Sequence, residues 1–210
     1  MLIILLWGEI SRAELSIQLV PGFLVGALGG EETGVSKGHS LGMAVQWNFP
    51  WGVFVGGRRE HVEFGVSQGV KKSGVMTLSG ASLGWGIPMG NIRLEASGTY
   101  FGNSAMVLKS KNSFLVNEDV YQYSIQETLR GEAPMGADLN FLWRKQNKRL
   151  SGDQLITIGL FGSVRVQSYN SVDFSVISSH QSVLPEKTES LRETYDFNWF
   201  VLGVSGGFTL

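Results

Sequence analysis

The 210-residue chain contains no cysteine, which excludes a disulfide framework, a thiolate metal site and a cysteine nucleophile. Charged residues are also few, at 17% of the sequence against about 25% in an average soluble domain. The formal net charge of -1 supplies no basic field and no acidic tail, so no nucleic-acid partner is expected. No segment approaches the ~20 consecutive apolar residues of a membrane helix. If the chain meets a membrane, it does so as strands.

The chain has instead a repeated alternation of apolar and small or polar residues. Successive side chains of a strand point to opposite faces of a sheet, so a period of two predicts strands with one apolar face. The pattern recurs about eight times, at 15–27, 41–49, 53–64, about 75–87, 92–101, about 129–144, about 154–167 and 197–210. The length fits one all-β domain, which we place at 14–210.

The connections between these segments alternate in length. Short ones, with tight-turn chemistry, lie at 50–52 and 88–91, and one of middling length lies at 145–153. Longer polar segments lie at 28–40, about 65–74, 102–120 and 168–195. In an up-and-down antiparallel meander this order collects short turns at one end and long loops at the other. Bacterial outer-membrane β-barrels have this layout, so we predict an antiparallel transmembrane barrel of about eight strands.

The second face of each strand decides between two kinds of barrel. A soluble, lipocalin-like carrier would turn its apolar face inward and carry Lys and Glu outside. Here the second face is mostly Gly, Ser, Thr, Asn and Gln, which suits the filled interior of a narrow cylinder. Its few charges must pair in a low-dielectric lumen. The predicted internal salt-bridge network consists of Arg93, Glu95, Arg130, Glu132, Asp138 and Arg165.

Aromatic residues sort by strand end, as in the two interfacial girdles of a membrane barrel. The predicted girdle at the short-turn end consists of Trp47, Trp51, Trp85, Trp143 and Phe208. A second belt near the loop end is expected from Tyr100, Phe101, Tyr121, Tyr123, Tyr169 and Tyr195. The segment 58–64 is polar on both faces, so we expect it beyond the bilayer. Pro21 and Pro134 remove ladder donors inside strands and predict bulges or unpaired carbonyls.

The two ends of the chain carry targeting patterns. Residues 1–13 combine an apolar run with Ser11-Arg12-Ala13, as at the end of a secretory signal, and the shortness of the run indicates a truncated leader. The last strand alternates towards Phe208 and Leu210 and resembles the C-terminal signal that the barrel-assembly machinery reads.

Over residues 14–210 the chain resembles the small eight-stranded outer-membrane barrels, the family of the outer-membrane protein A transmembrane domain and its loop-adhesin relatives. This resemblance is one of pattern, without a residue-specific motif. It implies an integral bacterial outer-membrane protein, monomeric, without cofactor, in contact with lipid and lipopolysaccharide. No peptidoglycan-binding domain follows in this sequence.

Candidate chemistry is sparse. His39 with Ser40 and nearby Glu31 or Glu32, and His180 with Ser179 and Ser182, are the histidine–serine pairs an outer-leaflet lipid hydrolase would need. His61 with Glu60 and Glu63 lacks a recognised metal-ligand spacing, and no metal site is expected. Possible lipopolysaccharide phosphate contacts in the outer loops are Lys37, Lys71, Lys72, Lys109 and Lys111.

Taken together, these patterns predict a non-enzymatic barrel with a side-chain-filled lumen. Its long loops, above all 102–120 and 168–195, would serve envelope integrity or adhesion to a host or other surface. The alternative is a narrow, porin-like channel, if the lumen charges line a hydrated path. A lipid A-modifying hydrolase is the third reading.

Overall fold

A computed structural model describes residues 13–29, 34–67, 72–116, 119–146, 155–178 and 187–210. Within these ranges the side chains of residues 130–155 and of some residues near the loop ends are not described. In the part of the chain so described, no helix is long and apolar enough to span a membrane. The proposed leader, residues 1–13, falls almost wholly outside the described residues.

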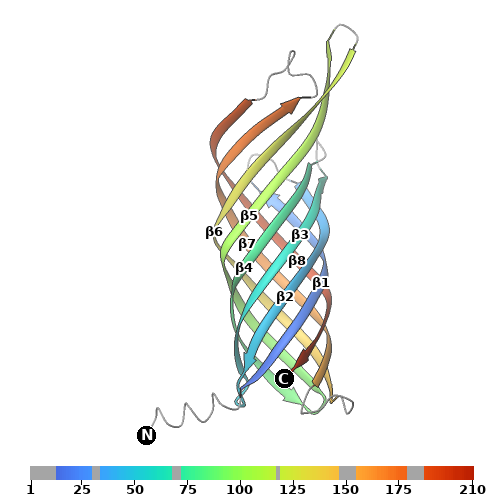
Figure 1. Ribbon diagram of the computed structural model, residues 1–210, viewed down its shortest axis with the longest axis vertical. Coiled ribbons are helices and arrows are strands. Elements are labelled where there is room, and N and C mark those ends of the chain that lie inside the picture. Colours follow the sequence, from blue (N-terminus) through green and yellow to red (C-terminus); the bar gives the residue numbers. More distant parts are fainter. Residues whose placement is uncertain (1–12, 30–33, 68–71, 117–118, 147–154, 179–186) are drawn as a thin grey trace.

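The described residues form eight strands that close into a barrel. Each strand pairs antiparallel with the next along the chain, and β1 pairs antiparallel with β8 to complete the ring (Figure 1). The strands are β1 (Glu14–Gly29), β2 (Gly34–Asn48), β3 (Val53–Ser67), β4 (Lys72–Met89), β5 (Ile92–Val116), β6 (Asp119–Gln146), β7 (Leu155–Ser178) and β8 (Lys187–Thr209). The predicted all-β, up-and-down antiparallel architecture is confirmed.

The two tight turns lie where the sequence predicts them. Between β2 and β3, the amide of Gly52 donates to the carbonyl of Phe49 over 3.0 Å, and Gly52 has a φ of 94°. Between β4 and β5, Gly90 has a φ of 65°. Residues with a side chain rarely adopt a positive φ, so glycine is the residue that lets both hairpins reverse within a few residues. These turns lie at the same end of the barrel as both termini of the sheet, here called the turn end (Figure 1).

The long polar segments are largely strand, which corrects the prediction of long loops. β5 continues to Val116 and β6 starts at Asp119, so the segment 102–120 is a hairpin that extends past the barrel at the opposite, loop end (Figure 1). In the same way β7 runs to Ser178 and β8 starts at Lys187, inside 168–195. Polar residues on both faces concealed the alternation here, because a strand beyond the apolar belt need not have an apolar face.

The segment 58–64 is likewise an ordinary part of β3, paired with β2 and β4, and its place beyond the bilayer stays a prediction. Arg58 and Glu60 are buried in the lumen, with Val62 and Phe64 further along the same inward face. The outward face carries the alternate residues Arg59, His61 and Glu63, which are exposed. A strand whose two faces are both polar is therefore part of the wall itself.

Both strand prolines disturb the ladder. Between β1 and β8 the pairing passes from Leu19↔Gly206 to Gly22↔Gly203, without pairs for Val20 and Pro21. A register shift separates Glu132 and Met135 in the β6–β7 ladder, next to Pro134. Proline cannot donate to a ladder, so the unpaired stretch at Pro21 and the bulge at Pro134 follow from its chemistry.

Candidate functional site

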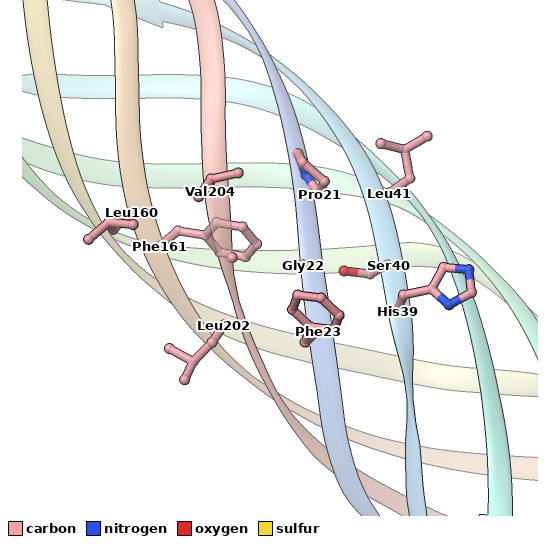
Figure 2. Close-up of a pocket in the computed structure, with 11 residues that line it drawn as sticks. Pro21, Gly22, Phe23, His39, Ser40, Leu41, Leu160, Phe161, Leu202 and Val204 are labelled. Carbon is pink, nitrogen blue, oxygen red and sulfur yellow. The ribbon is translucent and has the colours of Figure 1, made fainter.

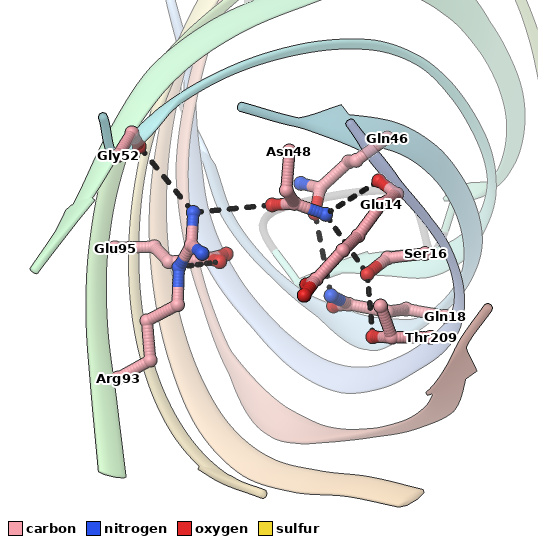
Figure 3. A network of polar contacts seen from close by, with 9 residues as sticks. All are labelled: Glu14, Ser16, Gln18, Gln46, Asn48, Gly52, Arg93, Glu95 and Thr209. Carbon is pink, nitrogen blue, oxygen red and sulfur yellow. Dashed lines mark hydrogen bonds and ion pairs between the residues drawn. The ribbon is translucent and has the colours of Figure 1, made fainter. Parts of the chain in front are cut away.

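The lumen at the turn end is a hydrogen-bonded polar network (Figure 3). Asn48 donates to Ser16 Oγ over 2.9 Å, and Ser16 in turn shares a 2.7 Å hydrogen bond with Thr209. Arg93 donates to Asn48 Oδ1 over 3.1 Å and to the Gly52 carbonyl over 3.3 Å. The network therefore links β1, β2, β5 and β8 across the interior and ties the turn-end hairpin to the sheet.

An ion pair closes the same network on one side. Arg93 Nε lies 2.8 Å from Glu95 Oε1, and both side chains are at least nine-tenths buried. Gln18 and Gln46 hydrogen-bond to each other over 3.3 Å on the neighbouring strands. A charge removed from water needs such a partner, because an unpaired buried ion costs several kcal/mol.

A second charged cluster lies between the polar network and the loop end. Arg165 Nη2 donates to Glu60 Oε1 over 2.8 Å, and Arg58 pairs with the same carboxylate oxygen. Arg165 is completely buried, and its guanidinium lies 5.1 Å from the centre of the Phe101 ring. The Arg58 guanidinium lies 5.7 Å from the Phe161 ring centre. Two cations thus share one anion, and aromatic faces contribute to their stabilisation.

The lumen towards the loop end is filled mainly by apolar side chains, and Ser36, Ser104, Ser110 and Glu127 are also buried there. Phe197 stacks on Phe64 with ring centroids 4.9 Å apart and packs against Trp199 at 4.5 Å. The buried apolar cluster consists of Val20, Leu24, Val62, Phe64, Val66, Met76, Leu78, Phe101, Met106, Leu108, Leu129, Phe161, Phe197, Trp199 and Val201. We call this set the loop-end plug. Met106 and Leu108 belong to it, although the sequence assigned them to a loop.

Of the predicted lumen charges, the structure brings Arg93, Glu95 and Arg165 inside the barrel. Only Arg93 and Glu95 contact each other, whereas Arg165 pairs with Glu60, which sequence reasoning had placed elsewhere. The side chains of Arg130, Glu132 and Asp138 lie outside the described residues. Arg58 and Glu60 were missed, although their alternation with Val62 and Phe64 carried the signal.

The residues of the predicted turn-end girdle point outward where they are described. Trp47, Trp51, Trp85 and Phe208 are all exposed, and Trp51 stacks on Phe49 with centroids 5.4 Å apart. The side chain of Trp143 lies outside the described residues. The second belt is wrong in one member: Tyr100 is exposed, but Phe101 is completely buried in the loop-end plug. Tyr100 and Phe101 are neighbours in β5, so they face opposite sides of the wall.

The histidine–serine pair that is described cannot act as a base and nucleophile together. His39 is exposed on the outer wall, and Ser40 is buried on the inner face. His39 Nε2 lies 3.4 Å from Glu63 Oε2, and His61 Nε2 lies 3.4 Å from Glu63 Oε1. Glu31, Glu32, Ser179, His180 and Ser182 lie outside the described residues.

A metal centre does not assemble either. Glu60 points into the lumen, while His61 and Glu63 lie on the outer wall, so the three side chains considered together are on two faces. Across the described ranges, no group of three or more His, Asp or Glu side chains could hold a metal ion. Of the five lysines, Lys37, Lys109 and Lys111 are exposed, and the surroundings of Lys71 and Lys72 are not described.

The outer wall carries a hollow beside Pro21 that sequence reasoning did not detect (Figure 2). Its volume is about 670 Å³, and it spans β2, β1, β8 and β7. Its lining includes Pro21, Gly22 and Gly203 at the β1–β8 seam and the exposed side chains of Phe23, Leu41, Leu160, Leu202 and Val204. His39 lies at its edge, and it also lines a second hollow of about 500 Å³ with Lys37, Glu63, Ser73 and Val75.

Comparison with known proteins yields only distant structural likeness. No family model and no curated protein matches the chain. Among solved structures, CarO2 of Acinetobacter baumannii has 13% identity and a TM-score of 0.32, over 87% of this chain and 99% of that one. The COG4313 outer membrane channel of Pseudomonas putida F1 has 9% identity and a TM-score of 0.25, over 91% and 95%.

A further similar structure is OmpT, an outer membrane protein of Vibrio cholerae, at 6% identity and a TM-score of 0.17. It covers 90% of this chain and 99% of that one. These scores are too low to carry an argument about function, and the resemblance to the outer-membrane protein A domain in particular stays a prediction.

Proposed function

We propose that the protein is an integral β-barrel of the bacterial outer membrane that anchors its loop-end hairpins at the cell surface and does not conduct solutes. One observation carries the proposal: a closed barrel with large apolar side chains exposed around its outside and a packed apolar plug inside. Exposed apolar surface on this scale is unfavourable in water and favourable against lipid. A filled lumen leaves the surface hairpins as the place for function.

The outward side chains support a lipid-facing belt. Leucine, valine, isoleucine and phenylalanine stand outward on successive strands, as in Leu19 and Phe23 of β1, Ile158 and Leu160 of β7, and Leu202 of β8. Exposed tryptophans at the turn end add a girdle of the kind that lies at a membrane interface. The C-terminal strand, with Phe208 and Leu210 outward, is the part that assembly machinery would recognise.

The extended β5–β6 hairpin is the natural contact element. β5 and β6 have 25 and 28 residues, against 15 for β2 and for β3. The extra length projects beyond the barrel at the loop end (Figure 1). In this proposal the monomeric barrel supports the hairpin, and the hairpin serves envelope integrity or adhesion.

A planar-bilayer recording tests the proposal. Folded protein, identified by its shifted migration on an unheated gel, is expected to insert without discrete channel openings. A narrow channel is the second candidate, favoured by the hydrogen-bonded polar lumen at the turn end. Discrete, salt-dependent openings from wild-type protein would replace the anchor proposal with the channel. Failure to insert into lipid at all would overturn both.

A further inference from the structure

We infer that the outer wall of β1, β2, β7 and β8 holds one molecule of lipid A, with an acyl chain in the hollow at Pro21 and a phosphate at Lys37 and His39. This inference rests on the proposed membrane location. The lipid would occupy two neighbouring hollows of this wall, of which the apolar one is drawn in Figure 2.

The lower hollow has the shape and chemistry of a seat for a hydrocarbon chain. Gly22 and Gly203 lie opposite each other across the β1–β8 seam as inward positions, so the outer wall there is backbone between the outward residues Pro21, Phe23, Leu202 and Val204. Pro21 lies beside them with a compact ring, where the ladder lacks a pair. Phe23, Leu160 and Leu202 rise around this low area and are 78%, 63% and 56% exposed. In a bilayer such a depression must be filled by acyl chain, because its walls offer water almost no partner.

The second hollow has the chemistry of a phosphate site. Lys37 and His39 are consecutive outward residues of β2, and both line it. Arg59 and His61 lie outward on the adjacent strand β3, opposite Met43 and Leu41. Glu63 is the opposing charge: it lies between the two histidines, 3.4 Å from each Nε2. Within the lining of this hollow, Lys37 and His39 are the basic side chains beside that single carboxylate.

The two hollows are neighbours on the wall, and His39 lines both. The apolar one extends from His39 towards the turn end, and the polar one extends towards the loop end, since β2 runs from Gly34 at the loop end to Asn48 at the turn end. That polarity matches a lipid whose headgroup is at the loop-end surface and whose chains point to the bilayer centre. With the loop end outside the cell, the phosphorylated amphiphile of that leaflet is lipid A.

The described outward residues of β7 and β8 lack this combination. Around β7 and β8 the outward residues at corresponding distances from the turn end are Val164, Val166 and Phe200, without a cation among them. Lys109 and Lys111 stand outward on β5, yet neither lines the hollows described here. They are therefore matched cations for a control.

Binding of lipid A to the detergent-folded, full-length protein tests the inference by native mass spectrometry. Lys37→Gln combined with His39→Gln is expected to weaken binding about tenfold, because charge-assisted hydrogen bonds to phosphate are lost. Lys109→Gln combined with Lys111→Gln is expected to change it less than about twofold. Lipid A from which both phosphates have been removed should bind wild type and the Lys37/His39 variant equally weakly.

A second pair of variants tests whether the apolar hollow holds an acyl chain. Leu160→Trp places a bulky ring at the edge of the lower hollow, whereas Leu83→Trp makes the same change on β4, away from it. These leucines are 63% and 62% exposed, so the two variants alter the lipid-facing surface alike. Leu160→Trp is expected to weaken lipid A binding at least threefold, about 0.7 kcal/mol, and Leu83→Trp to leave it unchanged.

Two results would overturn the inference. Equal binding of lipid A by wild type and the Lys37/His39 variant would show that these residues do not bind its phosphate. Tighter binding of phosphatidylglycerol than of lipid A would show that the hollow binds another lipid. Gel migration and vesicle insertion are measured on the same samples. Protein that inserts but does not bind lipid A contradicts only this inference, whereas protein that fails to insert contradicts the membrane proposal as well.

Discussion

The two ends of the lumen fill the same cylinder in different ways. At the turn end, Ser16, Asn48, Arg93 and Thr209 occupy the interior through directed hydrogen bonds. At the loop end, Phe64, Phe197 and their neighbours occupy it through packing. A hydrogen-bonded filling depends on the identity of each partner, while an apolar filling depends on volume. The charged cluster at Glu60 lies where the two meet.

The difference shows what a closed barrel requires. Polar side chains at the turn end could coexist with water, so by themselves they would not seal the lumen. The loop-end plug offers water few partners, so in the proposed anchor it is the plug that would separate the two sides of the barrel. Substitutions should therefore act differently in the three zones of the interior.

The largest effect is expected at the boundary. Glu60→Ala removes the carboxylate that Arg58 and Arg165 share, leaving two guanidinium groups without it in a buried site. Breaking a buried pair in this way should lower the free energy of unfolding by about 5 kcal/mol. Urea titration of the detergent-folded barrel, followed by tryptophan fluorescence, measures it. A loss below about 1 kcal/mol would show that the cluster is hydrated.

The loop-end plug should respond to lost volume. Phe197→Ala removes a completely buried ring that contacts Phe64 and Trp199, and the expected loss is about 3 kcal/mol. Met106→Leu, which nearly keeps the volume, should cost less than about 1.5 kcal/mol and provides the matched control. Equal losses in both variants would contradict a volume-dependent filling. The same urea titration applies.

The turn-end network should respond to lost partners. Asn48→Ala removes the acceptor for Arg93 and the donor to Ser16, for an expected loss of about 2 kcal/mol. Asn48→Leu has nearly the original volume and should cost as much, in contrast to the volume-conserving change in the plug. Full stability of the leucine variant would remove the distinction between the two ends.

The smallest effect is expected from a single hydroxyl. Ser16→Ala leaves Thr209 and Asn48 each without one partner, and should lower the free energy of unfolding by about 1 kcal/mol. Val201→Ala, at a buried apolar position of β8, provides a comparison in which stability is lost through side-chain volume instead of a hydrogen bond. A double substitution of Ser16 and Thr209 to Ala should cost less than the sum of the two single changes. Strict additivity would mean that the 2.7 Å contact contributes nothing.

Period-two alternation predicted the barrel and the direction of its faces. Leu19, Phe23 and Leu202 are exposed, as their positions in the pattern require, and Ser16, Arg93 and Thr209 are buried. The alternation fixes which face of the sheet each side chain lies on, whatever that side chain's role. The barrel could therefore be predicted without a residue-specific motif.

The loop-end plug could not be predicted in the same way. Met106 and Leu108 stand among Lys109, Ser110 and Lys111, so that stretch has no face of uniform polarity. Phe101 was assigned to the loop-end belt by residue type, although the alternation that buries Arg93, Glu95 and Thr99 places it on the inward face. The hollow at Pro21 depends on residues from four strands, and contacts so far apart in sequence leave no local signal.

The seam between β1 and β8 closes the barrel by pairing strands from opposite ends of the sequence. Ser16 and Thr209, which share a hydrogen bond there, are 193 residues apart. Contacts of such high sequence separation carry the largest loop-closure entropy, so they form late in folding. This seam is also where Pro21 leaves the ladder incomplete. The last seam expected to form thus contains a gap in its ladder. Amide exchange in the folded state should be faster at this gap than along the paired stretches of the same seam.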